Sequence, residues 1–229
     1  MRASLALLVL SGCTGAEVFA PGNGAGSDAA TEVVPPDAVA PDAGASVDGG
    51  VDAMANPVDA AVSCTPGITQ LLGDRGFEAV DGSWQTSGGT IIFTEAQMPI
   101  LAAAGSRAAR FLGRNAANER LLQGVIVPAG TTSLVLRGEL CFVTEEGGGP
   151  VDTLTIRLLD PANNPLDTFA SLSNLDAGAI CSWAPFTMAL AAPHAGQPVQ
   201  LEFHATADSA TVTSFYFDSL RLDANVTCP

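Results

Sequence analysis

Three stretches of this chain alternate apolar and polar side chains at every second position: residues 132–142, 151–160 and 198–206. Successive side chains of a strand point to opposite faces, so this period predicts β-strands with one buried face. Clusters rich in Gly, Pro, Asn and Asp lie between the stretches, as turns require. Only residues 95–105 have a locally helical composition, and Pro99 interrupts them. Repeated short strands joined by turns predict an all-β domain, an antiparallel sandwich or barrel.

The first residues have the layout of a secretory signal peptide. A single positive charge at Arg2 precedes an apolar run over residues 3–10, and small residues lead to Cys13. This end resembles the lipobox of bacterial lipoproteins, which implies that residues 1–12 are removed and that Cys13 carries a lipid. Thr14, rather than Asp, follows the cysteine, which by the same resemblance favours the outer membrane of the cell envelope. A plain signal peptide with an incidental cysteine is the alternative.

The composition then changes. Residues 14–63 contain eight acidic residues and five prolines, but no Lys, Arg, Trp or Tyr, and their Pro and Gly breaks leave no helical or strand period. Such a segment buries too little apolar surface to offset its ordering entropy. We therefore predict a lipid-anchored, disordered acidic linker over residues 13–63 and a folded domain over residues 64–229.

The overall charge excludes one class of partner. The chain has 24 acidic and 9 basic residues, all of the latter Arg, for a formal net charge of −15. Without a cluster of basic residues, such a chain is a poor candidate for binding nucleic acid through its phosphates.

Four cysteines fall in the predicted domain: Cys64, Cys141, Cys181 and Cys228. An exported protein can retain disulfides, and four cysteines allow three connectivities. We favour Cys64–Cys228 together with Cys141–Cys181, because the first pair lies at the two ends of a domain whose termini often lie side by side. Four free buried thiols are the alternative.

Over about residues 70–223 the chain resembles the galactose-binding-like jelly rolls, which occur as carbohydrate-binding modules and as accessory domains of secreted bacterial enzymes and surface lipoproteins. The resemblance implies two antiparallel sheets packed face to face, a jelly-roll β-sandwich, with the first and last strands adjacent. The motifs that carry it, in order, are "GDRGFEAVDGSW", "AAGSRAARFLG", "LLQGVIVPAGTTSLVLRGEL", "VDTLTIRLLDPANNPLDTF", Trp183, "HAGQPVQLEFHATAD" and "VTSFYFDSLRL".

The same resemblance implies a structural Ca²⁺. In such jelly rolls the glutamate of a Gly-Phe-Glu motif and an aspartate of the last strand often bind this ion, and the matching residues here are Glu78 and Asp218. Two carboxylates with backbone carbonyls and water would satisfy an ion that takes six to eight oxygens. A solvated Glu78 and a capping Asp218 are the alternative.

Members that bind sugars usually use exposed aromatic side chains or polar residues. Trp84 and Trp183 fall at positions that are usually packed in the core, and the facing of Tyr216 is left open. A polar face is the other candidate for ligand binding, provided that the strands concerned share a sheet. It would be formed by Arg137, Glu139, Arg157, Glu202 and His204.

The sequence offers no catalytic motif. It has no Gly-x-Ser-x-Gly elbow, and His194 and His204 have no partner at zinc-site spacing. Glu145 and Glu146 are adjacent on a glycine-rich loop, which does not fix the separation that glycosidase chemistry needs. We therefore expect no enzyme, but a lipid-anchored binding module for glycans or other envelope polymers. A structural or protein-interaction domain of the envelope, with no sugar ligand, is the alternative.

Overall fold

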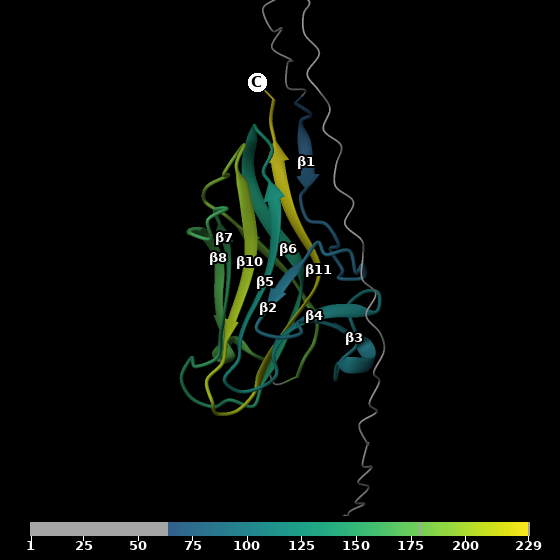
Figure 1. Ribbon diagram of the computed structural model, residues 1–229, viewed down its shortest axis with the longest axis vertical. Helices are drawn as coiled ribbons and strands as arrows, with labels where there is room; N and C mark the ends of the chain where they lie inside the picture. Colours follow the sequence, from purple (N-terminus) through teal and green to yellow (C-terminus); the bar gives the residue numbers. More distant parts are fainter. Residues whose placement is uncertain (1–63, 179, 229) are drawn as a thin grey trace, which may run out of the picture. The chain divides into compact units, whose positions relative to one another are not determined.

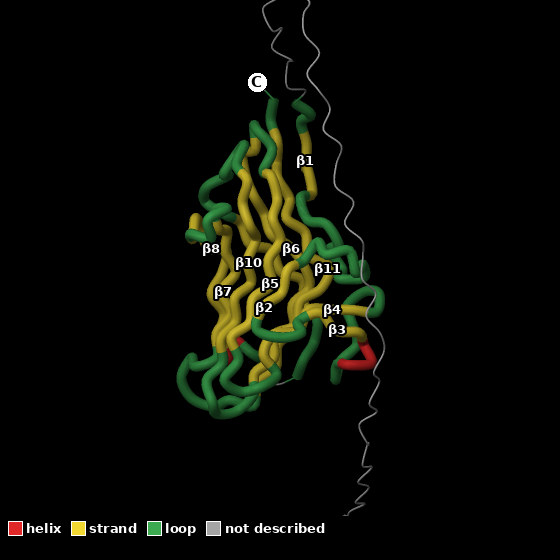
Figure 2. The backbone as a smooth tube through the Cα atoms, viewed as in Figure 1, coloured by secondary structure: helices red, strands yellow, loops and turns green. Residues whose placement is uncertain are grey.

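The computed structural model describes residues 64–178 and 180–228, and these form an all-β domain. Figure 1 shows its strands, and Figure 2 shows that strands and loops make up most of it. The predicted signal peptide, Cys13 and the whole of the predicted linker lie outside the described residues. The strands are β1 (Gly67–Gln70), β2 (Gln85–Ser87), β3 (Ile92–Thr94), β4 (Arg107–Leu112), β5 (Asn118–Ile126), β6 (Thr131–Thr144), β7 (Thr153–Leu159), β8 (Pro165–Ser173), β9 (Ala184–Ala189), β10 (Pro198–Thr206) and β11 (Thr213–Val226).

Two sheets pack face to face. The six-stranded sheet has the order β3-β4-β11-β6-β9, with β1 also paired to β11, and the five-stranded sheet has the order β2-β5-β10-β7-β8. Every ladder between these strands is antiparallel. The predicted antiparallel β-sandwich is therefore confirmed. The expected helical character of residues 95–105 is limited to the short 3-10 helix η1 (Glu95–Gln97). A second 3-10 helix, η2, covers Asn174–Asp176.

The core between the sheets follows the alternation of the strands. In β10, residues 199, 201, 203 and 205 are buried against the other sheet, while residues 200, 202, 204 and 206 point outward. The centre is aromatic: the rings of Phe203 and Phe217 lie 5.0 Å apart, and Phe111 packs against both. Trp84 is also in this core, as predicted, and its Nε1 donates to the carbonyl of Asp74 at 2.9 Å. Aromatic packing of this kind contributes beyond its buried area.

A bulge in β11 shifts the alternation. The register against β6 slips between Asp218 and Arg221, and Ser219 has a positive φ of 52°. Before the bulge Phe215 and Phe217 are in the core, and after it Leu220 and Leu222 are. Because a bulge re-aims side chains locally, Asp218 is directed under the segment that precedes β4, where it is fully buried.

The two ends of the domain are joined. β1 pairs with the C-terminal half of β11, so the first and last strands are adjacent as the family resemblance implied. A disulfide links Cys64 to Cys228, and a second links Cys141 to Cys181, which is the connectivity that we favoured. Among the described residues, no helix is long and apolar enough to cross a membrane.

Candidate functional site: the outer face of the five-stranded sheet

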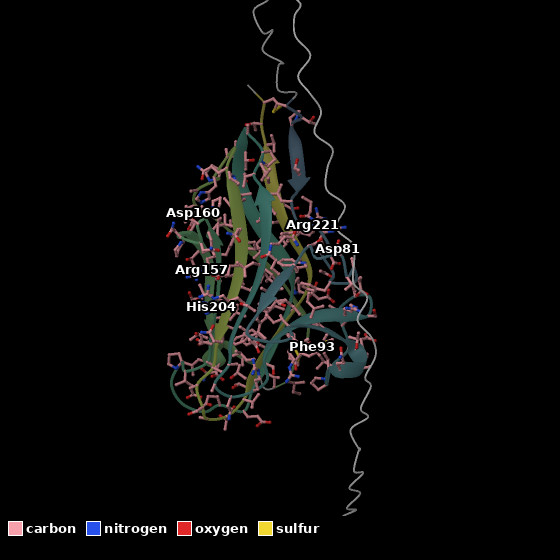
Figure 3. The ribbon with its side chains drawn as sticks, viewed as in Figure 1. Asp81, Phe93, Arg157, Asp160, His204 and Arg221 are labelled. Carbon is pink, nitrogen blue, oxygen red and sulfur yellow. A yellow bond between two sulfur atoms is a disulfide. The ribbon has the colours of Figure 1, made fainter. Side chains whose placement is uncertain are left out.

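The polar face expected from the sequence is divided between the two sheets. Arg157, Glu202 and His204 lie on β7 and β10 of the five-stranded sheet, whereas Arg137 and Glu139 lie on β6 of the six-stranded sheet. Figure 3 shows Arg157 and His204 away from Arg221, which lies on the six-stranded sheet. The expectation of one shared surface is therefore wrong. Alternation tells which side of a strand faces out, but not which sheet the strand joins.

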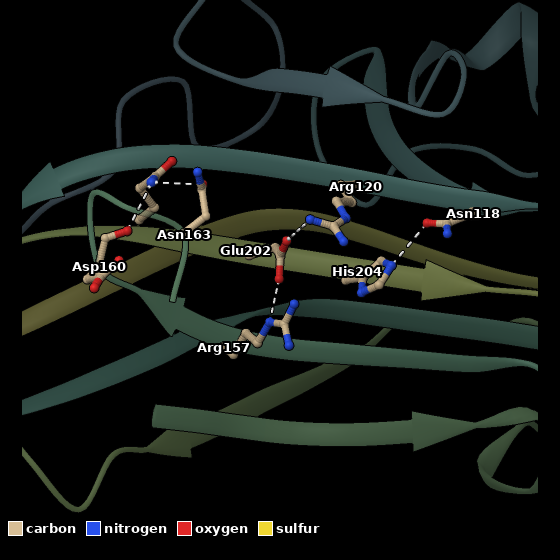
Figure 4. A network of polar contacts seen from close by, with 8 residues as sticks. Asn118, Arg120, Arg157, Asp160, Asn163, Glu202 and His204 are labelled. Carbon is tan, nitrogen blue, oxygen red and sulfur yellow. Dashed lines mark hydrogen bonds and ion pairs between the residues drawn. The ribbon is translucent and has the colours of Figure 1, made fainter. Parts of the chain in front are cut away.

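A buried carboxylate organises the face of the five-stranded sheet. The side chain of Glu202 has no exposed surface, although it lies on the outward side of β10 (Figure 4). Arg157 on β7 donates from Nε to Glu202 Oε2 at 2.5 Å, and Nη1 of Arg120 on β5 lies 3.4 Å from Oε1. Burying a carboxylate is costly unless it is paired, so the two arginines make this position possible. The side chain of Arg120 remains 42% exposed and that of Arg157 remains 23% exposed.

His204 continues the row toward one end of the sheet. Its Nε2 lies 3.0 Å from Oδ1 of Asn118 on β5. Burial lowers the pKa of His204 below 6.5, and the positive charges of Arg120 and Arg157 lower it further against the opposing effect of Glu202. The imidazole is therefore neutral at pH 7, and it can either donate or accept a hydrogen bond.

Gln200 continues the row in the other direction. Its Nε2 donates to the carbonyl of Asp160 and to Oδ1 of Asn163, both at 3.2 Å, so the turn between β7 and β8 is tied to the sheet (Figure 4). Asp160 is itself fixed, because it accepts hydrogen bonds from Asn164 and from the Ala162 backbone. Gln200, Glu202 and His204 thus form a line of polar groups whose neighbours hold them in place.

An apolar groove of 460 Å³ lies beside Gln200. Gly124 on β5 lies directly opposite Gln200 in the register, and a Cβ added there would meet nothing within 4 Å. Glycine weakens a strand interior, and such a position often marks where a ligand approaches the backbone. The groove wall is aliphatic and proline-rich, with the following residues contributing: Gln85, Gly124, Val125, Ile126, Pro161, Pro198, Val199 and Gln200.

Tyr216 and Trp183 are both engaged in packing on the six-stranded sheet. Tyr216 points to the outside of the six-stranded sheet but is 1% exposed, because Trp183 and Arg110 cover its ring. Trp183 lies outside the core, unlike the expectation from the sequence, and its Nε1 donates to the carbonyl of Leu101 at 3.0 Å. The Cys141–Cys181 disulfide joins the segment before Trp183 to β6, next to Tyr216 in the register. These rings therefore serve packing rather than an aromatic platform.

The side chains of Glu78 and Asp218 both lie close to Gly76. A Cβ added at Gly76 would be 3.7 Å from Cγ of Glu78 and 3.8 Å from Oδ1 of Asp218. Residues 104–107 donate to both carboxylates: the N–H groups of Ser106 and Arg107 reach Glu78 at 2.8 and 2.9 Å, and that of Ala104 reaches Asp218 at 2.9 Å. The sequence-predicted pair is thus brought together at the bulge of β11.

The environment of these carboxylates is compatible with a cation. The hydrogen bond from the Ser106 backbone lowers the pKa of Glu78, whereas burial raises the pKa of Asp218 and the nearby charge of Glu78 raises it further. Among the described residues, no Arg or His lies within 4.0 Å of Asp218 to neutralise it, and no group of three or more potential metal-binding side chains occurs. Two carboxylates with spare lone pairs therefore fit a Ca²⁺ whose other ligands are carbonyls and water.

Comparisons with known proteins find similar solved structures at low sequence identity. No family model and no curated protein sequence matches the chain. Among solved structures, a family 61 carbohydrate-binding module in complex with β-1,4-galactotriose is 16% identical with a TM-score of 0.44, over 67% of this chain and 97% of that one. The xylan-binding domain CBM22-1 from Paenibacillus barcinonensis is 15% identical with a TM-score of 0.45, over 72% and 100%.

An adhesin domain is also similar to this chain in structure, again at low sequence identity. The K3 domain of Lys-gingipain from Porphyromonas gingivalis is 12% identical with a TM-score of 0.47, over 69% of this chain and 99% of that one. The described domain is thus similar in fold to carbohydrate-binding modules and to an adhesin domain. Because every identity is below 25% and every TM-score below 0.5, we base the function on this chain's own residues.

Three residues of the face were not found from the sequence: Asn118, Arg120 and Gly124. Their strand, β5, hides its alternation because Glu119 and Gln123 point inward and are 2% and 4% exposed. Glu119 accepts from the Leu112 backbone at 2.7 Å, and Gln123 accepts from the Gly73 backbone at 2.6 Å. Because these polar residues occupy the core side of β5, apolar and polar residues do not alternate along it in the usual way. Arg120, Leu122 and Gly124 nevertheless lie on the opposite, outward side of the strand.

Proposed function

We propose that this protein is a non-catalytic binding module whose ligand is a glycan or another hydroxyl-rich polymer of the cell envelope. The observation that carries the proposal is the outer face of the five-stranded sheet, where a row of fixed polar groups ends at an open groove beside Gly124. Such a combination of apolar wall and few oriented polar groups is typical of ligand sites.

The face suits a sugar chemically. The amides of Asn118 and Gln200, the imidazole of His204 and the exposed edges of the two guanidinium groups can pair with hydroxyls. The C–H faces of sugar rings can pack on Ile126, Pro161 and Pro198, which line the groove. The polar groups are already held by neighbours, so binding immobilises few side chains and costs little conformational entropy.

The same face does not support hydrolysis. Glu202 is its buried carboxylate, and both of its oxygens face arginines. The glycosidase mechanism uses a pair of carboxyl groups on either side of the scissile bond, whereas Glu202 is a single carboxylate whose oxygens are engaged by the two arginines. Binding without catalysis is therefore the function that we assign.

We infer further that the module is displayed on the cell envelope, at the outer membrane, through a lipid on Cys13. The signal-like residues 1–12 and the acidic linker support this, and the domain end that follows the linker is fixed by the Cys64–Cys228 disulfide. Cys13→Ser should abolish incorporation of labelled palmitate and membrane fractionation. Continued labelling and membrane association of this variant would contradict the lipid anchor.

We infer also that Glu78 and Asp218 hold a structural Ca²⁺ with backbone carbonyls of the neighbouring segments. The ion would neutralise the buried Asp218 and join the segment around Gly76 to β11. Its contribution is to stability, and we assign it no part in ligand binding.

Gly124 provides the experiment that tests the binding face. The full chain is applied to a glycan array, and each glycan that binds is titrated with Gly124→Leu and with Gly147→Leu as the matched control. Both glycines have open space around them and neither has a positive φ, so both variants should fold. We expect Gly124→Leu to weaken binding at least tenfold and Gly147→Leu to leave it unchanged. Absence of any glycan that binds, or equal binding by both variants, would overturn the proposal in favour of a protein-interaction domain.

A further inference from the structure

Two arginines face each other on the outer side of the six-stranded sheet. Arg137 on β6 and Arg221 on β11 are direct partners in the register of these neighbouring strands. Their side chains are 52% and 44% exposed. Like charges directly opposite each other destabilise a sheet. The pair is notable in a chain that has only nine arginines against 24 acidic residues.

A single carboxylate lies between them. Asp223 on β11 accepts from Nη2 of Arg221 at 3.1 Å, while Nε of Arg137 is 3.7 Å from its other oxygen. Arg137 is therefore in ion-pair contact without a hydrogen bond to Asp223. The three groups carry a net charge of +1, and most N–H donors of both guanidinium groups have no partner among the described residues. Asp74, Arg75 and Glu78 line an adjacent pocket that shares Arg221.

A pocket of 510 Å³ opens at this cluster. The side chains of Ile68 and Val135 form an apolar wall, and Ile68 is 70% exposed. The hydroxyl of Ser133 and the amide of Asn225 complete the lining beside the arginines. The pocket thus combines two guanidinium groups, most of whose N–H donors have no partner among the described residues, with apolar and neutral polar side chains.

We propose that this pocket binds the carboxylate of an acidic sugar residue, such as a uronic acid. Planar guanidinium groups bind carboxylates through two parallel hydrogen bonds, and a second carboxylate would neutralise the remaining charge of the pair. Ser133 and Asn225 can pair with ring hydroxyls, and Ile68 with Val135 can pack against ring C–H groups. The site is compact and suits one residue of a polymer better than an extended acidic peptide.

This site is separate from the one on the five-stranded sheet. Its residues belong to β1, β6 and β11, and none of them lines the groove at Gly124. The two proposals can therefore fail independently.

The test is calorimetric titration of the full chain with a galacturonic acid trimer and with a neutral galactose trimer. We expect the acidic trimer to bind more tightly, with an affinity that falls as salt rises, because the attraction is between exposed charges. Arg137→Gln with Arg221→Gln should weaken this binding at least tenfold. Both changes remove like-charge repulsion, so the variant should fold.

Arg75→Gln is the control, because it removes one positive charge from the adjacent pocket and leaves the arginine pair intact. It should leave binding of the acidic trimer within about twofold. The proposal is overturned if the neutral trimer binds as tightly as the acidic one, or if the double variant binds like the unmodified protein. Tighter binding of a tri-aspartate peptide would overturn the assignment to a sugar.

Discussion

The outer faces of the two sheets each hold a carboxylate between two arginines, but the two clusters differ in how completely their charges are used. Glu202 receives one arginine from each neighbouring strand and its side chain is entirely buried. Asp223 receives Arg221 from its own strand and Arg137 from one neighbour, and its side chain is 12% exposed. The arginines around Asp223 are also more exposed, and a pocket adjoins them.

This difference distinguishes a structural ion cluster from a binding one. A carboxylate that is fully buried by its partners organises the surface around it, and its removal leaves charges that the fold must hold without compensation. A carboxylate at a partly exposed pair contributes little to stability because solvent screens it. The first cluster therefore positions neighbouring groups on the five-stranded sheet, while the second leaves donors available to a ligand.

A large loss of stability is expected on the six-stranded sheet, on removal of the Cys141–Cys181 disulfide next to Tyr216 in the register. Cys141→Ala with Cys181→Ala opens a loop closed at a separation of 40 residues, which should lower the free energy of unfolding by about 4 kcal/mol in the loop-entropy account. Denaturant titration measures the loss. Hydrogen exchange should rise in residues 174–183, which the bond connects to β6. Unchanged exchange there would show that the Trp183 packing alone holds this segment.

Glu202→Gln tests the structural cluster. The amide keeps the shape of the side chain but leaves Arg120 and Arg157 without a counter-charge. We expect a loss of about 3 kcal/mol, at the low end for buried pairs because both arginines are partly exposed. A shift in the urea midpoint at constant m-value would report it. A loss below 1 kcal/mol would place the Glu202 cluster in the same class as the Asp223 cluster.

Asp218 is a buried carboxylate of the six-stranded sheet. Glu202 and Asp223 are each paired with two arginines, but no arginine of the described residues pairs with Asp218. A bound Ca²⁺ would supply the positive charge instead. At a free Ca²⁺ concentration 100 times its Kd, binding to the native state alone adds about 2.7 kcal/mol to stability. The melting temperature should therefore rise in Ca²⁺ relative to EDTA, and Glu78→Gln should remove the rise. Equal melting temperatures in both media, with no calcium found by elemental analysis, would exclude the ion.

Asp223→Asn is the matched counterpart of Glu202→Gln. Because the pair is partly exposed, the loss in stability should not exceed about 1 kcal/mol. The variant also removes the carboxylate that competes with a bound acid, so the galacturonic acid trimer should bind severalfold more tightly. Weaker binding of the trimer would mean that Asp223 orients the arginines instead of competing with the ligand.

The smallest expected effect is the dependence of stability on pH at His204. Its pKa in the folded protein is lowered, chiefly by burial, so the unfolded chain takes up a proton first as pH falls below 6.5. Above pH 6.5, His204 does not lower the free energy of unfolding. As pH falls from 6.5 toward the lower pKa of His204 in the folded protein, the free energy of unfolding decreases. Unfolding titrations at pH 7.5 and 5.5 should show a smaller loss for His204→Gln than for the unmodified chain. An equal loss in both would assign the pH dependence to other groups.

Much of the architecture could be predicted from the sequence. The period of two located strands such as β6, β7 and β10, because burial of one strand face is a local property of the residues. Cysteine positions at the ends of the domain also favoured the Cys64–Cys228 bond that the structure contains. The Gly-Phe-Glu motif, through its family resemblance, placed Glu78 near Asp218, and both side chains indeed lie close to Gly76.

The division of charges between the two faces was decided only by the tertiary structure. Strands β6 and β7 follow each other in the chain but join different sheets, so Arg137 and Arg157 lie on opposite outer faces. Arg120, Glu202 and Arg157 meet because β10 lies between β5 and β7, although Arg120 and Glu202 are 82 positions apart in sequence (202 minus 120). Local residue patterns determine which side of a strand is buried, whereas the order of strands in a sheet depends on the packing of the whole core.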